Sequence, residues 1–292
     1  MLYISTFIAK LIILFFGLAG NFIGLIVFAR KSIDKKIKTK PIYQALLFID
    51  SVFLFSQVFQ DTFDSLGIKL SHMSIIACKL RGYWNFSIGA ISIWYLVYIT
   101  IERYLQIRFN HFKLLKQKNM QIIIIILVIV YNLVAYCPFS IFYEIIPDYD
   151  SSLNETYVYC SFKDLYIEFI MFTFDTANAT VFPFVIINIF SCLLIYTIIS
   201  SRIKAMRMQS HTERNKIFKD IRISISILAI NLAILLSLQI QIANYFFTDL
   251  DPFYYDISCC IYYCYYSLDA YFLFLLNSNF RSEFLLFFKQ NN

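Results

Sequence analysis

Residues 78–108, CKLRGYWNFSIGAISIWYLVYITIERYLQIR, decide the fold of this chain. Positions 82–101 form a run of twenty residues without a charge, which matches the roughly 20 residues that a helix needs to cross about 30 Å of hydrocarbon. Cys78 and Arg103 lie 25 residues apart, and a helical rise of about 1.5 Å per residue separates them by roughly 38 Å. The pattern predicts a membrane-spanning helix with a thiol at one end and an arginine at the other.

Composition indicates a membrane environment for the whole chain. Hydrophobic residues make up 60% and charged residues 15% of the 292 residues, and the mean hydropathy is +0.66. Both fractions lie outside the range of ordinary soluble domains, so we predict an integral membrane protein. The net charge of +6 does not indicate a nucleic-acid partner, because the basic residues lie in short segments between apolar runs, where membrane topology explains them better.

Seven apolar runs follow one another along the chain without a visible internal repeat. The fourth contains an isoleucine run, 122–126, which propensity alone would assign to a strand. An open strand in lipid would leave its backbone groups unpaired, so we predict a helix there as well. The expected fold is an all-α bundle of seven transmembrane helices in one domain, 1–292, followed by a short surface helix at about 280–289. The predicted spans are 7–29, 42–65, 76–108, 119–139, 167–201, 217–248 and 253–279.

The charges between the runs predict how the chain is oriented. Of the 25 Lys and Arg residues, 20 follow the first, third, fifth or seventh run, and the positive-inside rule places these segments in the cytoplasm. Twelve of the 19 Asp and Glu residues fall on the opposite side, including Glu168 and Asp175 ahead of the fifth apolar run. We therefore expect a multi-pass plasma-membrane protein with an anionic outer face, an extracellular amino terminus and a cytoplasmic carboxyl terminus.

Two features of the outer segments fit this orientation. Asn154 begins an Asn-Glu-Thr triplet, which is a glycosylation acceptor when it faces the outside. Of the seven cysteines, Cys78 and Cys160 alone lie in outer segments, on the oxidising side where disulfides persist. The two cysteines either form a bridge, which we favour, or remain free thiols.

The third run also carries a family resemblance. Seven runs, an outer cysteine at the head of the third, and Glu102-Arg103-Tyr104 at its inner end resemble the rhodopsin-like (class A) G-protein-coupled receptors, whose pattern there is acid-Arg-Tyr. Arg103 alone would be an interfacial cation of the kind that many helices have. The resemblance implies that an extracellular ligand shifts the helices so that Arg103 meets a heterotrimeric G protein, with Phe109 or Phe112 as further contacts.

The resemblance extends to four polar residues in the apolar runs. Asn21 resembles the family's Gly-Asn pair, Asp50 ends a similar second-span segment, and Ser92 and Asp269 match a hydroxyl and a seventh-span acid or amide. Charges at bilayer depth are costly and usually face a polar interior. In similar receptors this cluster binds a sodium ion, so the resemblance implies a possible allosteric Na⁺ site at Asp50, Ser92 and Asp269. Without a cation, the two carboxyl groups would share a proton. No other cofactor is expected.

Several family features are missing. Residues 269–273 read Asp-Ala-Tyr-Phe-Leu where the family has Asn-Pro-x-x-Tyr, the sixth run contains neither Trp nor Pro, and the fourth contains no Trp. With these departures the chain resembles a divergent member of the family, one without the family's sixth-span aromatic switch and kink.

The ligand that we expect is a small basic or amidated neuropeptide, of the kind recognised by FMRFamide-like receptors. Asn85 stands where amine receptors carry an ammonium-binding Asp, which argues against a biogenic amine. Asp61 and Asp64 of the acidic outer rim would attract a cation, and Tyr262 in the tyrosine-rich seventh run would stack on a guanidinium group. Packing and interfacial anchoring explain the tyrosines equally well.

Two alternatives remain. A chemosensory receptor would have the same fold, and a cation-coupled transporter would use Asp50 and Asp269 as a relay, although the repeats and midplane breaks of transporters are not visible. The three histidines have no metal-ligand spacing and no catalytic constellation stands out, so we do not expect an enzyme.

We predict that antibody reaches a tag at the amino terminus in intact cells, and reaches a tag at the carboxyl terminus only after permeabilisation. The expected odd number of spans and the distribution of bases require opposite sides for the two ends. Permeabilised cells, in which both tags are labelled, are the control. Labelling of both tags in intact cells would contradict the predicted topology.

Overall fold

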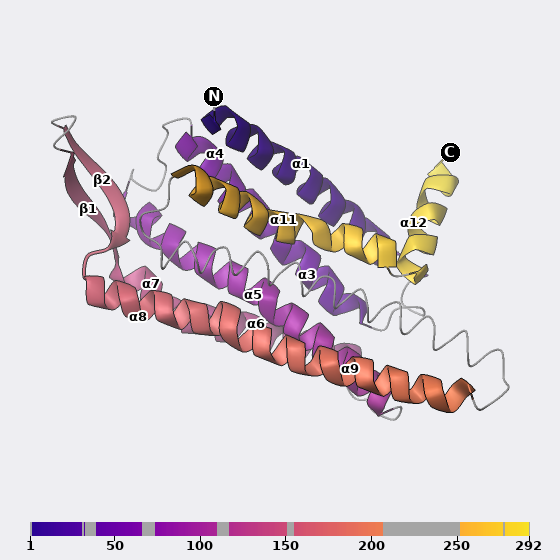
Figure 1. The fold of residues 1–292 in the computed structure, drawn as a ribbon. Coiled ribbons are helices and arrows are strands. Elements are labelled where there is room, and N and C mark those ends of the chain that lie inside the picture. Colours follow the sequence, from indigo (N-terminus) through magenta and orange to yellow (C-terminus); the bar gives the residue numbers. More distant parts are fainter. Residues whose placement is uncertain are drawn as a thin grey trace.

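The computed structural model describes residues 2–30, 32, 39–65, 74–109, 117–150, 155–206, 252–276 and 278–291. This part of the chain is mostly helical, with a β-hairpin at one end of a bundle of long helices (Figure 1). The predicted sixth span, 217–248, lies outside the described residues.

The helices and strands follow one another in a simple order. In chain order the elements, where η marks a π-helical segment, are α1 (Leu2–Ala29), α3 (Lys40–Phe53), η1 (Leu54–Val58), α4 (Phe59–Ser65), α5 (Ile75–Arg108), α6 (Lys118–Ala135), α7 (Cys137–Phe142), β1 (Tyr143–Asp150), β2 (Glu155–Phe162), α8 (Leu165–Asp175), η4 (Thr176–Val181), α9 (Phe182–Met206), α11 (Pro252–Leu276) and α12 (Ser278–Asn291).

Five segments of the described chain are helical, long and apolar enough to cross a membrane. They are Thr6–Ala29, Lys40–Asp64, Ile75–Arg108, Lys118–Phe142 and Leu165–Ser200. A bent pair, Asp256–Leu275 and Phe280–Leu286, would make a sixth span, and its two helices differ in direction by 85°. The predicted membrane character is thereby supported, while the count of seven stays a prediction. The isoleucine run 122–126 is helical, as expected for backbone groups in lipid.

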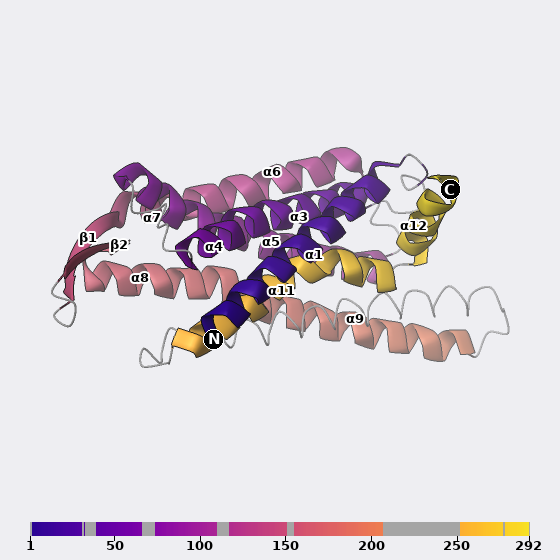
Figure 2. The same ribbon diagram turned by 90° about the horizontal axis from the view of Figure 1, so that it is seen from above.

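The helix α5 occupies the middle of the bundle. It packs against α3, α6 and α9, while α1 packs against α11 and α3 (Figures 1 and 2). In the most apolar window of α5, 67% of the residues are buried, against 17% in the helix of α6 and α7. A helix that buries so little of an apolar surface suits a lipid-facing position, whereas α5 is a core helix.

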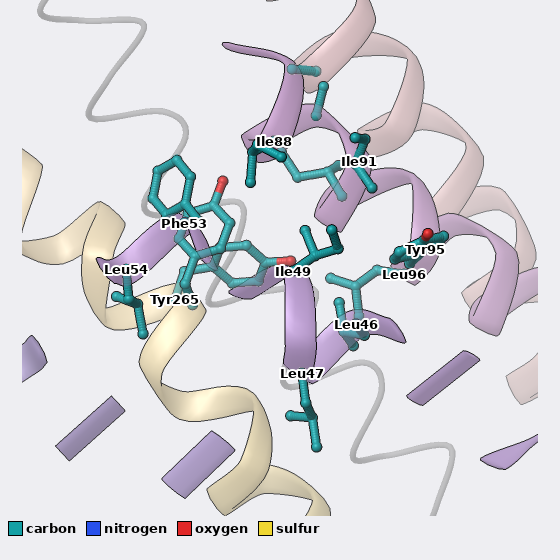
Figure 3. Packing of buried hydrophobic residues seen from close by; sticks show 14 of the residues in the cluster. Leu46, Leu47, Ile49, Phe53, Leu54, Ile88, Ile91, Tyr95, Leu96 and Tyr265 are labelled. Carbon is teal, nitrogen blue, oxygen red and sulfur yellow. The ribbon is translucent and has the colours of Figure 1, made fainter. Parts of the chain in front are cut away.

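Aliphatic and aromatic side chains fill the core between α3, α5 and α11. Phe53 of α3 stacks on Tyr266 of α11 with ring centroids 3.9 Å apart, an offset contact that contributes beyond the buried area. Gly20 of α1 makes room for Tyr271 of α11, because a Cβ at this position would lie 2.6 Å from the ring. Figure 3 shows the packing around α3 and α5, with Leu46, Leu47, Ile49, Phe53, Leu54, Ile88, Ile91, Tyr95, Leu96 and Tyr265 labelled.

The amino terminus, the start of α11 and the hairpin lie at one end of the bundle, which we call the hairpin end (Figure 1). A disulfide between Cys78 and Cys160 joins the first turn of α5 to β2 there, which confirms the favoured pairing. Ser74 caps α5 by accepting a 3.1 Å hydrogen bond from the backbone nitrogen of Ala77. Gly82 lets the hairpin approach α5, because a Cβ there would lie 2.9 Å from the ring of Tyr143.

The hairpin is a feature that the sequence analysis missed. Its strands pair antiparallel, from Tyr143 opposite Phe162 to Asp150 opposite Glu155. The signal was two runs rich in β-branched and aromatic residues around the polar segment 151–154. The sequence analysis assigned this segment only to the outside, between two predicted spans, and strand pairing satisfies its backbone groups.

A helix is present where a short surface helix was expected at about 280–289, and α12 is slightly longer than that range. Phe280 is buried and lies 5.0 Å from Phe28 of α1, between ring centroids. Ser32 donates a 2.6 Å hydrogen bond to the carboxylate of Glu283. These contacts attach α12 to the end of α1, opposite the hairpin end (Figure 1).

We predict that replacing Cys78 or Cys160 by Ala lowers the free energy of unfolding by about 2–5 kcal/mol, because the bridge restricts the unfolded chain. Thermal unfolding of the purified protein in detergent measures the change. Cys192→Ala removes an exposed free cysteine of α9 and is the matched control. The single variants and the double variant should unfold alike, since each lacks the same bond, and a much less stable double variant would contradict the prediction.

Candidate functional site

The four predicted polar residues come together in the interior of the bundle. Asn21, Asp50, Ser92 and Asp269 are all buried. Ser92 donates a 2.5 Å hydrogen bond to Oδ1 of Asp50, and the amide of Asn21 donates a 3.1 Å hydrogen bond to the backbone carbonyl of Tyr266. The carboxyl groups of Asp50 and Asp269 lie within hydrogen-bonding reach of each other. Side chains of α3, α5 and α11 thus form one polar cluster, and Asn21 of α1 is bonded to α11 three residues before Asp269.

The oxygens of this cluster fit a small hard cation. Among the described residues, Oδ2 of Asp50, both carboxylate oxygens of Asp269 and Oδ1 of Asn21 have no hydrogen-bond donor. Two buried carboxylates that lack donors repel each other unless a proton or a cation lies between them. Sodium prefers such oxygen ligands, and Asp50 and Asp269 with Ser92 and Asn21 would hold it. In the described part of the chain, no group of three or more His, Cys, Asp or Glu residues could hold a metal.

The predicted Glu-Arg-Tyr triplet lies near the end of α5 opposite the hairpin. Arg103 donates to the hydroxyl groups of Tyr43 and Thr39 at 3.3 and 3.5 Å, so its guanidinium contacts the start of α3 and the residue before it. Glu102 is buried and accepts a 2.6 Å hydrogen bond from Gln106. These contacts give the arginine partners on a neighbouring helix, which the sequence did not reveal.

Of the other residues that the sequence analysis named in and after the triplet, the structure describes Tyr104 and Phe109. Tyr104 packs edge-on against Phe190 of α9 with ring centroids 5.5 Å apart. Phe109 follows the last residue of α5 and is exposed. Phe112 and the glycosylation candidate Asn154 lie outside the described residues.

A cavity of about 370 Å³ lies at the hairpin end, between the hairpin and helices α3, α5, α8 and α11 together with η1 and η4. Its size is at the lower end of the range for small-molecule sites. Asn85 and Tyr262, both predicted to bind ligand, are among its walls. The complete lining is Phe53, Gln57, Arg81, Gly82, Asn85, Phe86, Ala90, Ile93, Tyr143, Tyr159, Cys160, Phe172, Asp175, Ala179, Thr180, Cys259, Tyr262 and Tyr263.

Two π-helical segments contribute to the cavity walls. Gln57 lies in η1, and Ala179 and Thr180 lie in η4. Short π-helical turns inside longer helices are frequent at functional sites, because they re-aim the side chains around them. Tyr143 faces the cavity from β1, and burial raises the pKa of its phenol to about 12 despite the opposing effect of Arg81. Tyr143 is therefore uncharged at physiological pH.

Ion pairs at the hairpin end join four helices. Lys10 of α1 pairs with Asp256 of α11 at 2.9 Å and lies 4.0 Å from Asp61 of α4. Arg81 of α5 pairs with Asp64 at 3.0 Å and lies 4.0 Å from Asp61. Tyr263 of α11 also donates a hydrogen bond to Asp61. The predicted rim acids Asp61 and Asp64 thus have cationic partners within the protein.

A polar network behind the cavity was missed by the sequence analysis. The hydroxyl of Tyr136 donates a 2.7 Å hydrogen bond to Oδ1 of Asp175. Asn178 donates to the same hydroxyl at 3.3 Å and accepts a 2.8 Å hydrogen bond from the hydroxyl of Tyr131. The sequence analysis counted Asp175 with the outer acids. The helix α8 begins at Leu165, however, so Asp175 lies ten residues into the fifth membrane span. The available signal was a carboxylate preceding a long apolar run.

Comparison with models of known protein families and with curated proteins finds no match for this chain. Its function therefore has to be argued from the polar cluster, the cavity and Arg103.

We predict that the protein unfolds at a higher temperature in sodium chloride than in choline chloride at the same ionic strength. Binding to the folded state alone stabilises it by about 1 kcal/mol when sodium exceeds its dissociation constant roughly fivefold. Asp50→Asn should abolish the response, whereas Glu168→Gln, which changes an acid of α8 outside the cluster, should keep it. An equal sodium response in Asp50→Asn would exclude this site.

Proposed function

We propose that this chain is a G-protein-coupled receptor that converts binding of an extracellular ligand, a small basic or amidated neuropeptide, into G-protein activation. The observation that carries the proposal is the placement of two distinct sites on one helix. Asn85 of α5 lines the cavity at the hairpin end, and Arg103 of the same helix contacts Tyr43 and Thr39. The two residues are 18 positions apart, which is roughly 27 Å along a helix.

The mechanism requires that the ligand bind two arrangements of the helices with different affinity, since only differential affinity shifts a population. The cavity is lined by α3, α5 and α11 as well as the hairpin and η4, so a ligand there contacts helices that also meet at the polar cluster. A change in their packing would release Arg103 from Tyr43 and Thr39. The guanidinium would then meet a helix of the G protein, with Phe109 and Phe112 beside it.

The polar cluster lies between these two sites in this proposal. A sodium ion at Asp50, Ser92 and Asp269 would favour the arrangement in which the four helices enclose it. An orientation with the hairpin end outside accounts for the disulfide, for the glycosylation acceptor at Asn154 and for the basic segments on the other side. The proposal includes the predicted sixth span, 217–248, which lies outside the described residues.

A cation-coupled transporter is the second candidate, and one observation favours it. Asp50 and Asp269 form a buried acid pair of the kind that relays protons or sodium in transporters. A chemosensory receptor would use the same sites for a different ligand. Substrate uptake driven by a sodium or proton gradient, without any G protein, would distinguish the transporter.

We predict that Arg103→Ala lowers agonist-stimulated G-protein activation at least about tenfold at equal surface expression, the size of a coupling free energy of ~1.4 kcal/mol. The measurement is nucleotide exchange on G proteins, with a library of basic and amidated peptides as agonists. Arg108→Ala removes an exposed arginine from the last turn of the same helix and is the matched control. An agonist that signals undiminished through Arg103→Ala would refute the role of this residue.

A further inference from the structure

We infer that Asp175 is the carboxylate that recognises one basic group of the ligand, and that the cavity takes an organic cation with an aromatic body, such as the last residues of a basic amidated peptide. The inference rests on the proposed function only for the peptide character of the ligand. It assigns the recognition of charge to the fifth span, which the sequence analysis did not consider.

The position of Asp175 suits this role. It lines the cavity, and its Oδ1 accepts the 2.7 Å hydrogen bond from Tyr136. Its Oδ2 accepts no hydrogen bond from the described residues. Tyr136 is fully buried and is itself held by Asn178 at 3.3 Å. The carboxylate is therefore held by one neutral donor, the Tyr136 hydroxyl, at Oδ1, which leaves Oδ2 for a group in the cavity.

Three other acids at the hairpin end already have cationic partners. Asp61, Asp64 and Asp256 share the two cations Lys10 and Arg81 in the ion pairs described above. In the described part of the chain, Asp175 has no cation within ion-pair distance, and residues 223–251 contain no Lys, Arg or His. Asp175 thus differs from the other acids in facing the cavity without a counter-ion, and charges at this depth are rarely left unpaired.

The remaining walls indicate what the cation is attached to. Rings of Phe53, Phe86, Phe172 and Tyr262 line the same cavity, and such rings bind guanidinium and aromatic groups by stacking. Asn85, Gln57 and Thr180 provide amide and hydroxyl groups that would bind a carboxamide. A volume of about 370 Å³ admits a dipeptide-sized ligand but not a long peptide.

The test compares two probes that differ in one charge. The probes are N-acetyl-arginyl-phenylalanine amide and its citrulline counterpart, which replaces the guanidinium by a neutral group of nearly the same shape. Affinities of both are measured by surface plasmon resonance on the full chain in nanodiscs, so no G protein takes part.

We expect the natural protein to bind the arginine probe about 10-fold to 100-fold more tightly than the citrulline probe, the range for a hydrogen bond to a charged group. Asp175→Asn should abolish this preference and keep the affinity for the citrulline probe, which shows that the cavity is intact. Asp175→Glu should keep a preference, and Glu168→Gln on the same helix is the matched control and should not change it. If Asp175→Asn does not fold, Tyr136→Phe tests the same contact and should reduce the preference by a smaller factor.

The inference is overturned if the natural protein binds both probes equally at millimolar concentration, or if the preference survives in Asp175→Asn. It is also overturned if Asp175→Asn fails to fold and Tyr136→Phe leaves the preference unchanged. Failure of the proposed function gives a different result. Binding that depends on Asp175 without any G-protein activation would refute the receptor and keep this inference, while an agonist response independent of Asp175 would do the reverse.

Discussion

The structure depends on one constraint, which is that a charge inside an apolar bundle needs a partner of opposite charge, a hydrogen-bond donor or a cation. The ion pairs of Lys10 and Arg81 meet it at the hairpin end and tie α1, α4, α5 and α11 together. In the interior, the carboxylates of Asp50 and Asp269 satisfy this requirement only in part, because three of their four oxygens have no hydrogen-bond donor among the described residues. Among the described residues, Asp50 and Asp269 in the interior and Asp175 at the cavity are therefore the acids to which the proposals assign a function.

The sequence predicted the features that follow from local patterns. A charge-free run located the third helix closely, since 76–108 was expected and Ile75–Arg108 is observed. The position of Cys78 and Cys160 in segments predicted to face the oxidising outside identified the disulfide. The partners of individual acids could not be predicted. Asp61 and Asp175 look alike in the sequence, yet one lies beside Lys10 and Arg81 and the other beside Tyr136. Such pairings depend on helix rotation and on the hairpin, which side-chain hydropathy does not determine.

The central helix α5 connects the sites on which the proposed receptor function rests. The disulfide fixes its first turn, Asn85 lines the cavity, Ser92 joins the polar cluster and Arg103 reaches the start of α3. A displacement of α5 at one end is expected to be felt at the other, because 67% of the residues in its most apolar segment are buried against neighbouring helices. This continuity gives a physical basis for communication between the two sites.

The π-helical segment η4 fixes the rotational phase of the fifth span. It separates α8, which carries Asp175, from α9, which packs along α5. Each residue of an α-helix turns the chain by about 100° around the helix axis. The wider π-helical turn therefore determines which way the side chains of α8 point relative to those of α9. Loss of a single residue from 176–181 would leave α9 in place and swing the Asp175 carboxylate out of the cavity. The length of this short segment is therefore as important for the chemistry of the cavity as the identity of the acid.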